Sequence, residues 1–389
     1  MRILMLVYNQ TGKGTYWRAM GFAQGLARKG HNVVVVSTSP TARLRVTTRK
    51  EGLVQLIESP DLLFGPLRSG WDLWNVQARI RFLKELSFDI VHAFETRPVV
   101  IWPALAVTRK KNVKLVLDWA DWFGRGGAVE ERPNPLIRNI VRPVETFFET
   151  HYRLQTDYTT VINSYLRQKA LACGVPAESI HILHNGSNVA FKPIDMHIAR
   201  QQSGLPNKPR IIGFVGGTYH QDARFMALAY NQVLSHNPNV KLLLVGYFNR
   251  PIENWVIRPE TIIRTGPLSL NAIYTYLSAC DICWLPLRDS GANRGRLPFK
   301  LNDYMTVARP TVATDVGDLR MIVEQNRLGV IARPNIDDFA KHTLELLQNP
   351  AQIRAMGLSA RKAAETVFSW NKLATKLEGI YLKILANRC

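Results

Sequence analysis

Residues 2–38 read RILMLVYNQTGKGTYWRAMGFAQGLARKGHNVVVVST, and this stretch decides the fold. An apolar run at residues 2–8 predicts a strand, which turns at Gly12, Lys13 and Gly14 into a segment with helical spacing of apolar residues. That segment ends at Gly30, and a second apolar run follows it. A strand, a helix and a strand in this order form a βαβ unit, which requires a parallel sheet with a right-handed crossover.

The rest of the chain repeats this alternation in two series. Apolar runs at residues 89–94 and 113–120 continue the first series, and a helical pattern at residues 71–86 precedes them. The second series of buried-strand patterns lies at residues 210–217, 241–246, 280–287, 311–317 and 329–334. The sequence therefore predicts an α/β protein with two tandem Rossmann-like, doubly wound domains facing a cleft.

The linker between the two domains is expected at residues 190–209, where Pro-Lys and Lys-Pro pairs and a glycine interrupt the periodicity. We predict an N-terminal domain of residues 1–195 and a C-terminal domain of residues 196–369. A closing helix within residues 370–389 is long enough to pack back on the N-terminal domain.

Composition excludes several classes of protein. The 389 residues are 46% hydrophobic and 21% charged, which is ordinary for a folded globular chain and excludes disorder and collagen. Only four cysteines occur, so a reducing, cytoplasmic compartment is predicted. The N-terminal apolar run is followed by Asn9 and Gln10, which favours a strand over a signal peptide. An uncharged apolar stretch of ~18 residues, as a transmembrane helix needs, is absent from the sequence.

The chain is strongly basic, with 50 Lys and Arg against 30 Asp and Glu and a formal charge of +20. Such an excess favours an anionic partner: nucleic acid, a phospholipid surface or a phosphorylated substrate. The excess is densest in the first 50 residues, and it includes Arg43, Arg45, Arg49 and Lys50. Because the sequence has no zinc finger or RNP motif and spreads its charge over both domains, a nucleic-acid partner is not expected.

The default binding site of such a protein lies at the carboxyl ends of its parallel strands. The first strand-to-helix turn brings Gly12, Lys13, Gly14 and Thr15 there, together with a helix N-terminus that can hold an anion or a hydroxyl-rich substrate. The turn is neither a GxGxxG motif nor a Walker loop, so a turn that only packs the helix on the strand is an equal alternative.

Four stretches of the sequence resemble one family. Residues 161–193 run through Gly-Val-Pro and Asn185-Gly186 toward Phe191 and Pro193, and residues 266–287 match a turn, a helix and an Ala-Cys-Asp strand. Residues 296–319 carry Pro-x-Lys-Leu and acid-Tyr-Met landmarks, and residues 367–381 carry a closing Ser-Trp helix. With Gly30-His31 and the strand ending at His92, the likeness spans nearly the whole chain. The chain resembles the retaining GT-B nucleotide-sugar glycosyltransferases of family 4, the superfamily of glycogen synthases and mannosyltransferases.

The resemblance implies a reaction and a set of site residues. The reaction is retaining transfer of a sugar from a nucleotide-diphospho-sugar, held by the C-terminal domain, to a hydroxyl acceptor held by the N-terminal domain. The implied catalytic residues are Lys300, Arg296 and Asp121. The implied donor-binding residues are Gly216, Gly217, Thr218, Gly266, Arg294, Leu301 and Asp303. The implied acceptor-binding residues are Gly12, Lys13, Gly14, Thr15 and His92.

Physical chemistry favours the same donor site. Pro298 suits the first turn of a helix, so Lys300 would lie near a helix N-terminus, where a diphosphate meets both a dipole and a cation. Asp303 lies one turn further on and can accept hydrogen bonds from a ribose diol. Arg294 and Arg296 precede the helix and can neutralise phosphate charge. The alternative is a group of solvated surface ion pairs, which contributes little to stability.

The chain departs from the family pattern at three positions. Gly295 stands where the first of two spaced acids is usual, Gly217 where an arginine is usual, and Ala120 where a histidine is usual. Asp289 is a candidate replacement for the acid, and His220 a further candidate for the diphosphate. These departures keep a second hypothesis open, a catalytically silent scaffold with the same fold.

Two smaller features have ordinary explanations beside the functional ones. His92 ends a strand, where contact with acceptor or donor and a satisfied core histidine are equally good interpretations. Cys280 and Cys283 form a single CxxC in an apolar run, and we predict buried thiols rather than a metal or redox site. Because Asp-x-Asp and His/Cys clusters are absent from the sequence, we expect no cofactor and activity without a divalent metal ion.

The basic N-terminal region predicts reversible docking on an anionic membrane at the cytoplasmic face, where a lipid-linked acceptor would be reached. Arg43, Arg45, Arg49 and Lys50 are the predicted contacts. The 71–86 helix, with Trp71, Trp74, Arg79, Arg81 and Phe82, is a candidate interfacial helix, although core packing explains its aromatic residues equally well. A soluble enzyme with a saccharide or phosphorylated acceptor is the competing interpretation.

Overall fold

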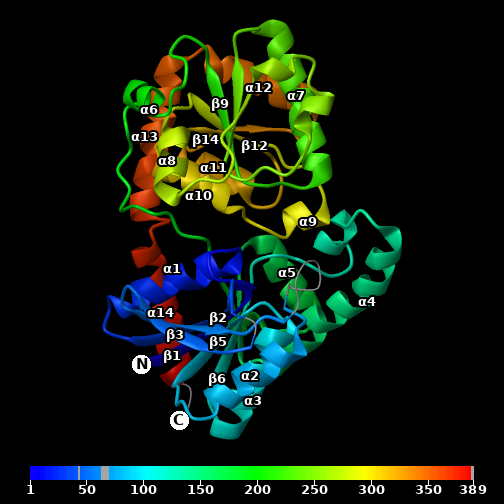
Figure 1. Ribbon diagram of the computed structural model, residues 1–389, viewed down its shortest axis with the longest axis vertical. Coiled ribbons are helices and arrows are strands. Elements are labelled where there is room, and N and C mark those ends of the chain that lie inside the picture. Colours follow the sequence, from blue (N-terminus) through cyan, green and yellow to red (C-terminus); the bar gives the residue numbers. More distant parts are fainter. Residues whose placement is uncertain (43, 63–69, 387–389) are drawn as a thin grey trace. The chain divides into compact units, whose positions relative to one another are not determined.

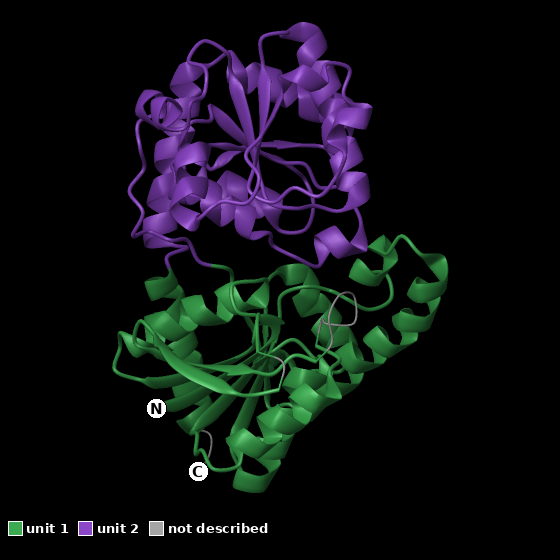
Figure 2. Ribbon diagram, viewed as in Figure 1, with its two compact units in different colours: residues 1–185, 370–389 green, residues 186–369 purple. Residues whose placement is uncertain are grey.

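The chain forms two separate α/β units, which are coloured differently in Figure 2. The computed structural model describes residues 1–42, 44–62 and 70–386. Unit 1 comprises Met1–Asn185 with Trp370–Cys389, and unit 2 comprises Gly186–Ser369. Each unit holds its own parallel sheet with helices packed on it (Figure 1).

The predicted boundary at residue 195 is wrong by ten residues, because the first unit ends at Asn185. Contacts within unit 2 begin immediately after it. Ser187 forms a β-bridge with Ser369, and the Arg361 guanidinium donates to the carbonyls of Val189 and Phe191 at 3.0 and 2.8 Å. The expected structureless linker at 190–209 also contains a helix, α6 (Met196–Gln202), which the Asp195 carboxylate caps.

Unit 1 contains a sheet of eight described strands in the order β3-β4-β2-β1-β5-β6-β7-β8. Their bounds are β1 Arg2–Gln10, β2 Asn32–Thr38, β3 Thr47–Glu51, β4 Val54–Ser59, β5 Ile90–Phe94, β6 Lys114–Trp119, β7 Tyr158–Val161 and β8 Ile180–Ile182. All neighbours pair in parallel except β3, which runs antiparallel to β4 at the edge. In the register, Ile3 pairs with Val33 on one side and Ile90 on the other. The apolar runs that predicted β1, β2, β5 and β6 are buried on both faces, as parallel sheets require.

The helices of unit 1 cover both faces of this sheet. Their bounds are α1 Thr15–Ala27, α2 Leu73–Leu83, α3 Pro98–Lys111, α4 Pro135–His151, α5 Ser164–Ala172 and α14 Trp370–Ala386, with 3-10 turns at Ala128–Glu131, Tyr152–Gln155 and Ala177–Ser179. Helix α14 packs against α1 at two glycines. A Cβ at Gly21 would lie 2.3 Å from the Trp370 ring, and one at Gly25 would lie 2.4 Å from Ala374 Cβ. Glycine is required there because the two helices approach so closely.

Unit 2 contains a six-stranded, fully parallel sheet in the order β11-β10-β9-β12-β13-β14. The strands are β9 Ile211–Val215, β10 Lys241–Val245, β11 Ile262–Arg264, β12 Ile282–Leu285, β13 Thr311–Thr314 and β14 Gly329–Ala332. The helices besides α6 are α7 His220–His236, α8 Leu270–Ser278, α9 Gly291–Arg294, α10 Phe299–Thr306, α11 Leu319–Asn326, α12 Ile336–Leu347 and α13 Pro350–Thr366, with 3-10 turns at Ile252–Trp255 and Pro259–Thr261. This strand order is the Rossmann order 3-2-1-4-5-6, which confirms the doubly wound prediction.

The sequence patterns missed β4 as well as the short or polar strands. β3 carries Thr47, Thr48, Arg49, Lys50 and Glu51 and reads as a polar loop. It forms because it pairs with β4, and this pairing cannot be predicted from the residues of β3 alone. β7, β8 and β11 have only four, three and three residues, too few to show a period.

Candidate functional site

The strand order of each sheet marks where a ligand is expected. In an open α/β sheet, ligands bind beyond the carboxyl ends of the two strands at which the order reverses. In unit 1 these strands are β1 and β5, which are neighbours. In unit 2 they are β9 and β12. The loops after these four strands are therefore the candidate site, and each unit is described by itself below.

In unit 1, the loop after β1 is the predicted turn. Gly12 and Gly14 have positive φ angles of 81° and 52°, and a Cβ at Gly14 would lie 2.5 Å from Asn9 Oδ1. This Asn9 oxygen accepts hydrogen bonds from the Thr15 backbone N–H and hydroxyl, at 2.7 and 2.6 Å. The Thr15 side chain is therefore buried and its hydroxyl proton is already used, and its contact with the acceptor stays a prediction. Gly12, Lys13 and Gly14 are exposed at the sheet edge.

The loop after β5 holds a residue that the sequence reasoning missed. Glu95 is buried and has a φ of 71°, which is strained for a residue that is not glycine. Its Oε1 accepts hydrogen bonds from the backbone N–H groups of Ala120 and Asp121, at 2.8 and 3.2 Å. Burial raises the pKa of Glu95 well above its usual value, although Arg153 opposes this. The only sequence signal was a polar residue directly after a buried strand.

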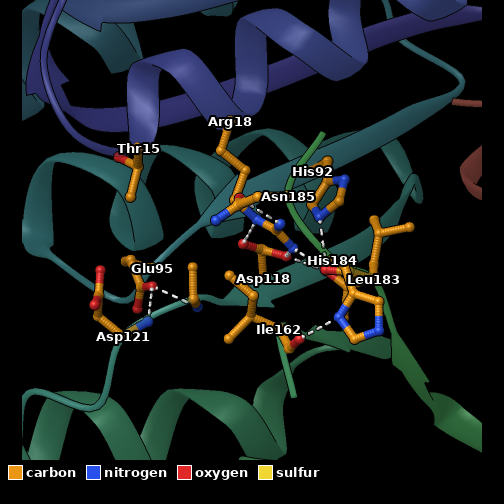
Figure 3. A network of polar contacts seen from close by, with 12 residues as sticks. Thr15, Arg18, His92, Glu95, Asp118, Asp121, Ile162, Leu183, His184 and Asn185 are labelled. Carbon is orange, nitrogen blue, oxygen red and sulfur yellow. Dashed lines mark hydrogen bonds and ion pairs between the residues drawn. The ribbon is translucent and has the colours of Figure 1, made fainter. Parts of the chain in front are cut away.

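Figure 3 shows Glu95 and Asp121 close together, joined by the hydrogen bond from the Asp121 N–H. Asp121, a predicted catalytic residue, follows β6 and is partly exposed. The structure thus brings the α1 turn, Glu95 and Asp121 to one edge of the sheet. Carboxylates and backbone groups of this kind can orient a polyhydroxylated ligand by accepting hydrogen bonds.

Beneath this edge lies a buried ion pair between Arg18 of α1 and Asp118 of β6 (Figure 3). The Arg18 guanidinium donates to both Asp118 carboxylate oxygens at 2.8 Å, to the Leu183 carbonyl at 2.7 Å and to Asn185 Oδ1 at 3.0 Å. Burial pushes the pKa of Asp118 upward, but the charge and hydrogen bonds of Arg18 outweigh burial and hold this pKa below its usual value. The network ties α1 and β6 to the last residue of unit 1.

The prediction that His92 contacts a ligand is wrong. His92 is the middle residue of β5 and is fully buried. Its Nδ1 and Nε2 lie 2.6 Å from the Tyr381 hydroxyl and 3.2 Å from Thr160 Oγ1. Burial lowers the pKa of His92 to about 4, so the ring is neutral at physiological pH. It is a satisfied core histidine, which was the alternative interpretation.

In unit 2, the loop after β9 and the start of α10 meet. The Lys300 ammonium donates to the Gly217 carbonyl at 2.8 Å. A Cβ at Gly216, which has a φ of 67°, would lie 3.6 Å from Lys300 Nζ. Pro298 is the N-cap residue of α10 rather than part of its first turn, and Lys300 is the second residue of the helix. The structure thus places Gly216, Gly217 and Lys300 side by side, and their role in donor binding stays a prediction.

Asp222 on α7 organises the loop after β12, and the sequence reasoning missed it. This buried carboxylate accepts hydrogen bonds from the Arg288 backbone N–H at 3.1 Å and from Asn293 Nδ2 at 3.0 Å. Arg296 Nη2 lies 3.4 Å from Asp222 Oδ2, and its guanidinium stacks over the Tyr219 ring at 4.5 Å. Burial raises the pKa of Asp222, while Arg296 opposes that effect. Asp222 thus positions Arg296 beside the β9 loop.

The other predicted donor residues have different surroundings. Arg294 forms an exposed ion pair with Asp289, with two nitrogen–oxygen distances of 2.5 and 2.6 Å. The Thr218 carbonyl accepts a hydrogen bond from Arg250 at 3.2 Å. Gly266 follows the edge strand β11 and bridges to Gly246. The Leu301 side chain is buried in the core, so a direct contact of that side chain with the donor is wrong.

Comparison with known proteins agrees with this geometry. A family model described as Glycosyltransferase Family 4 matches residues 14–191, and one described as Glycosyl transferases group 1 matches residues 209–349. The chain belongs to the family-4-like glycosyltransferases.

Individual glycosyltransferases are distant in sequence but similar over most of the chain. The alpha-D-kanosaminyltransferase of Streptomyces kanamyceticus is 22% identical over 336 residues, which cover 83% of this chain and 84% of that protein. The sucrose-phosphate synthase of Thermosynechococcus elongatus has a TM-score of 0.78 at 17% identity, over 99% of both chains. The Anabaena protein HepE in complex with UDP and glucose has a TM-score of 0.67 at 16% identity, over 98% of this chain and 100% of that one. These structures show that the glycosyltransferase has the GT-B fold.

Two residues of α10 in this glycosyltransferase, Lys300 and Asp303, have pKa values shifted toward neutral pH. Burial lowers the pKa of Lys300 to about 8, and the neighbouring Arg296 adds to that effect. Burial raises the pKa of Asp303 to about 7, against the opposing charge of Lys300. Tyr274 donates a hydrogen bond to Asp303 Oδ1 at 3.4 Å. Both groups therefore titrate near neutral pH, which is common in functional sites.

Three further features of the sequence analysis concern the CxxC cysteines, metal ligands and membrane-spanning helices. Cys280 and Cys283 are buried thiols, as predicted. They do not point to opposite faces, because a Cβ at Gly213 would meet both sulfur atoms, at 2.5 and 3.3 Å. Within the described ranges, no group of three His, Cys, Asp or Glu side chains is placed to hold a metal ion. Among the described helices, none combines the length and the apolar character needed to cross a bilayer.

The residues expected to touch a membrane are only partly available for it. Arg43 lies outside the described residues. Arg45 and Lys50 are exposed, but Arg49 forms ion pairs with Glu51 at 2.8 Å and with Glu58 at 3.6 Å. Arg79 of α2 cannot be a surface cation, because it is buried and donates to the Val7 and Val99 carbonyls at 2.9 and 2.7 Å. The interpretation of α2 as a helix with basic residues facing lipid is therefore wrong at Arg79.

Proposed function

We propose that this glycosyltransferase moves a sugar from a nucleotide-diphospho-sugar to a hydroxyl acceptor with retention of anomeric configuration. The acceptor is a lipid-linked or saccharide molecule of glycolipid or cell-surface polysaccharide synthesis. Unit 2 binds the donor, and unit 1 binds the acceptor through the α1 turn and Asp121, whose backbone N–H donates to the buried Glu95.

One observation carries the donor assignment. Lys300 lies on the first turn of α10, against the exposed backbone of Gly216 and Gly217, with Arg296 held nearby by Asp222. A helix N-terminus, open glycine backbone and fixed cations together are the elements that bind phosphate groups. Anabaena HepE, which is similar in structure, is described in complex with UDP and glucose.

The proposed chemistry depends on positioning and electrostatics. As the glycosidic bond to the diphosphate breaks, negative charge develops on the leaving oxygen, and Lys300 and Arg296 stabilise it. The partly exposed Asp121 of unit 1 orients the acceptor hydroxyl toward the anomeric carbon, which reduces the entropic part of the barrier. The name of the Streptomyces relative specifies an alpha-D-glycosyl group, which supports retention from an alpha-linked donor.

A screen of nucleotide sugars tests the donor assignment. Thermal unfolding of the full chain is measured with UDP-, GDP- and TDP-sugars, and a ligand at about 100 times its Kd should add roughly 2.7 kcal/mol of stability. The same screen on Lys300→Ala, with the exposed Lys362→Ala as a matched control, should lose the shift only in the first variant. No shift with any nucleotide sugar would contradict the proposal and favour a silent scaffold.

Product analysis tests the retention of anomeric configuration, and chelation tests whether the reaction needs a divalent metal ion. NMR of the product from an alpha-linked donor should show an alpha linkage, and a beta linkage would contradict retention. We expect turnover to survive EDTA, since the proposed charge stabilisation uses side-chain cations. Strict dependence on Mg²⁺ or Mn²⁺ would overturn that expectation.

A further inference from the structure

The start of the loop after β6 is held by a side chain from the neighbouring loop. Glu95, which follows β5, accepts hydrogen bonds from the backbone N–H groups of Ala120 and Asp121 at 2.8 and 3.2 Å (Figure 3). The N–H of Glu95 donates to the Asp118 carbonyl at 3.2 Å. A single residue therefore bonds three residues at the end of β6, and Asp121 is the last of them.

Other carboxylates hold the rest of this loop in the same way. Glu149 of α4 accepts hydrogen bonds from the N–H groups of Phe123 and Gly124 at 2.9 and 2.6 Å. Glu130 accepts one from the Gly126 N–H at 3.2 Å. These side-chain oxygens satisfy backbone donors that a strand or a helix would otherwise satisfy. Loss of one carboxylate should therefore release only the part of the loop that it holds.

The backbone of Glu95 is strained at this position. Its φ of 71° lies in the left-handed region, where glycine would be free of strain. Its side chain is only 1% exposed, and a buried carboxylate is costly unless it is hydrogen-bonded. Strain and burial in one residue are typical of a side chain that has a function where it stands.

Arg153 provides the counter-charge of Glu95. It lies in the 3-10 turn Tyr152–Gln155, is buried, and places Nη2 at 3.9 Å from Glu95 Oε2. Its guanidinium lies over the Trp119 ring at 3.6 Å. In the described part of the chain, none of its three nitrogens has a hydrogen-bond partner, so no other acceptor draws it away from Glu95. Burial lowers the pKa of Arg153, and the charge of Glu95 is the strongest opposing effect.

We propose that Glu95 is a positioning residue of the acceptor site, because its carboxylate fixes the backbone that directs the Asp121 side chain. The role of Asp121 in binding the acceptor is part of the proposed function, on which this assignment rests. Glu95 acts through Asp121, since its own carboxylate is buried. A loop that is fixed before the acceptor arrives loses less freedom on binding, which lowers the KM for the acceptor.

Hydrogen exchange of the full chain tests the hydrogen bonds themselves. In Glu95→Ala the amides of Ala120 and Asp121 should exchange at least about tenfold faster, as measured by mass spectrometry of peptides across residues 118–124. Glu95→Gln keeps an acceptor oxygen of the same reach and should stay within about threefold of wild type. Both variants remove the charge beside Arg153 and keep the strained backbone, so their difference reports the hydrogen bonds alone.

The same loop offers a matched control. Glu130→Ala removes the carboxylate that holds Gly126, at the far end of the loop, and should leave exchange at Ala120 and Asp121 unchanged. If Glu95→Ala gives too little folded protein, Glu95→Gly takes its place, because glycine adopts a φ of 71° without strain.

Transfer kinetics test the link to the acceptor. The donor is the nucleotide sugar selected by the thermal screen, and the acceptor probes are a panel of octyl glycosides. Glu95→Ala should raise the KM for the acceptor at least about tenfold, while hydrolysis of the donor by water stays within about twofold of wild type. Glu95→Gln should restore the KM for the acceptor to within about threefold. A purely structural role would lower hydrolysis and transfer together.

Three outcomes would overturn the proposal. They are unchanged exchange of the Ala120 and Asp121 amides in Glu95→Ala, the same increase in exchange in Glu130→Ala, or an equal loss of hydrolysis and transfer. A wild-type protein that glycosylates none of the probes would count against the proposed function instead. Hydrogen exchange would then still decide whether Glu95 fixes the loop.

Discussion

The two units share a doubly wound parallel arrangement but present different groups at the edge where their strands end. In unit 2 the loop after β12 carries Arg296, and helix α10 carries Lys300 beside the glycine backbone of the loop after β9. In unit 1 the loops after β5 and β6 hold Glu95 and Asp121. The arginines close to that edge in unit 1 are inside the core, where they neutralise buried carboxylates.

The comparison separates what the fold contributes from what the loops contribute. Parallel strands bring four loops to one edge in either unit, whatever their residues. Under the proposed function, the cations of unit 2 attract a diphosphate, while Asp121 of unit 1 accepts hydrogen bonds from hydroxyl groups. The following predictions test this difference, beginning with the largest expected effect.

Breaking the buried pair of unit 1 should cost the most. Asp118→Ala leaves the Arg18 guanidinium buried without its main partner, which typically destabilises by about 3–5 kcal/mol. Urea denaturation followed by circular dichroism should show the loss in the transition of unit 1. The matched control is Asp315→Ala in unit 2, which removes an exposed pair with Arg320 and should cost less than about 1 kcal/mol. Equal losses would show that burial does not distinguish the two pairs.

Removing the central cation of unit 2 should affect the reaction rather than folding. Lys300→Ala should lower kcat/KM about 100-fold, because the leaving diphosphate loses a fixed cation in a partly buried position. Initial rates with the nucleotide sugar selected by the thermal screen measure this, and Lys362→Ala should leave them unchanged. Near-normal kinetics in Lys300→Ala would remove α10 from the donor site.

The pH dependence should be bell-shaped and narrow. Asp303, with a pKa of about 7, accepts hydrogen bonds from a ribose most strongly when ionised, so activity should rise as pH increases through 7. Lys300, with a pKa of about 8, holds a diphosphate best when protonated, so activity should fall as pH increases through 8. The measurement is kcat/KM from about pH 5.5 to about pH 9.5.

The acidic limb of that profile has its own test. Asp303→Asn should remove the rise near pH 7 and keep the fall near pH 8, with weaker nucleotide binding throughout. An unchanged acidic limb in this variant would assign the lower titration to another group.

The smallest effect is expected at Arg294. Its guanidinium already pairs with Asp289 at an exposed position, so the pair is screened by solvent. Arg294→Ala should raise the KM for the donor by less than about fivefold and leave kcat nearly unchanged. A loss as large as that of Lys300→Ala would mean that the donor draws Arg294 away from Asp289.

Much of the donor half could be predicted, because its signals are local. Gly216, Gly217 and Lys300 follow recognisable strand and helix patterns, and the ends of those elements must meet at one edge of a parallel sheet. Glu95, Arg18 and Asp222 could not be found in this way. Each acquires its role from partners far along the chain, as Arg18 does from Asp118 and Asn185. His92 was placed in the correct strand, but only the packing of Tyr381 and Thr160 around it decided that it is buried.

The sequence by itself determined the α/β alternation, the two parallel sheets and the glycosyltransferase family. These features depend on hydrophobic periodicity and on motifs at strand ends, and both involve residues that are adjacent in the sequence. The tertiary structure alone decided which side of each amphipathic segment meets the core. The apolar spacing of α4 would normally predict a buried apolar face. Arg97, Trp119 and the Gly124 backbone instead hold Glu145 and Glu149 inside, since buried carboxylates must keep their partners, and the apolar face is left at the surface.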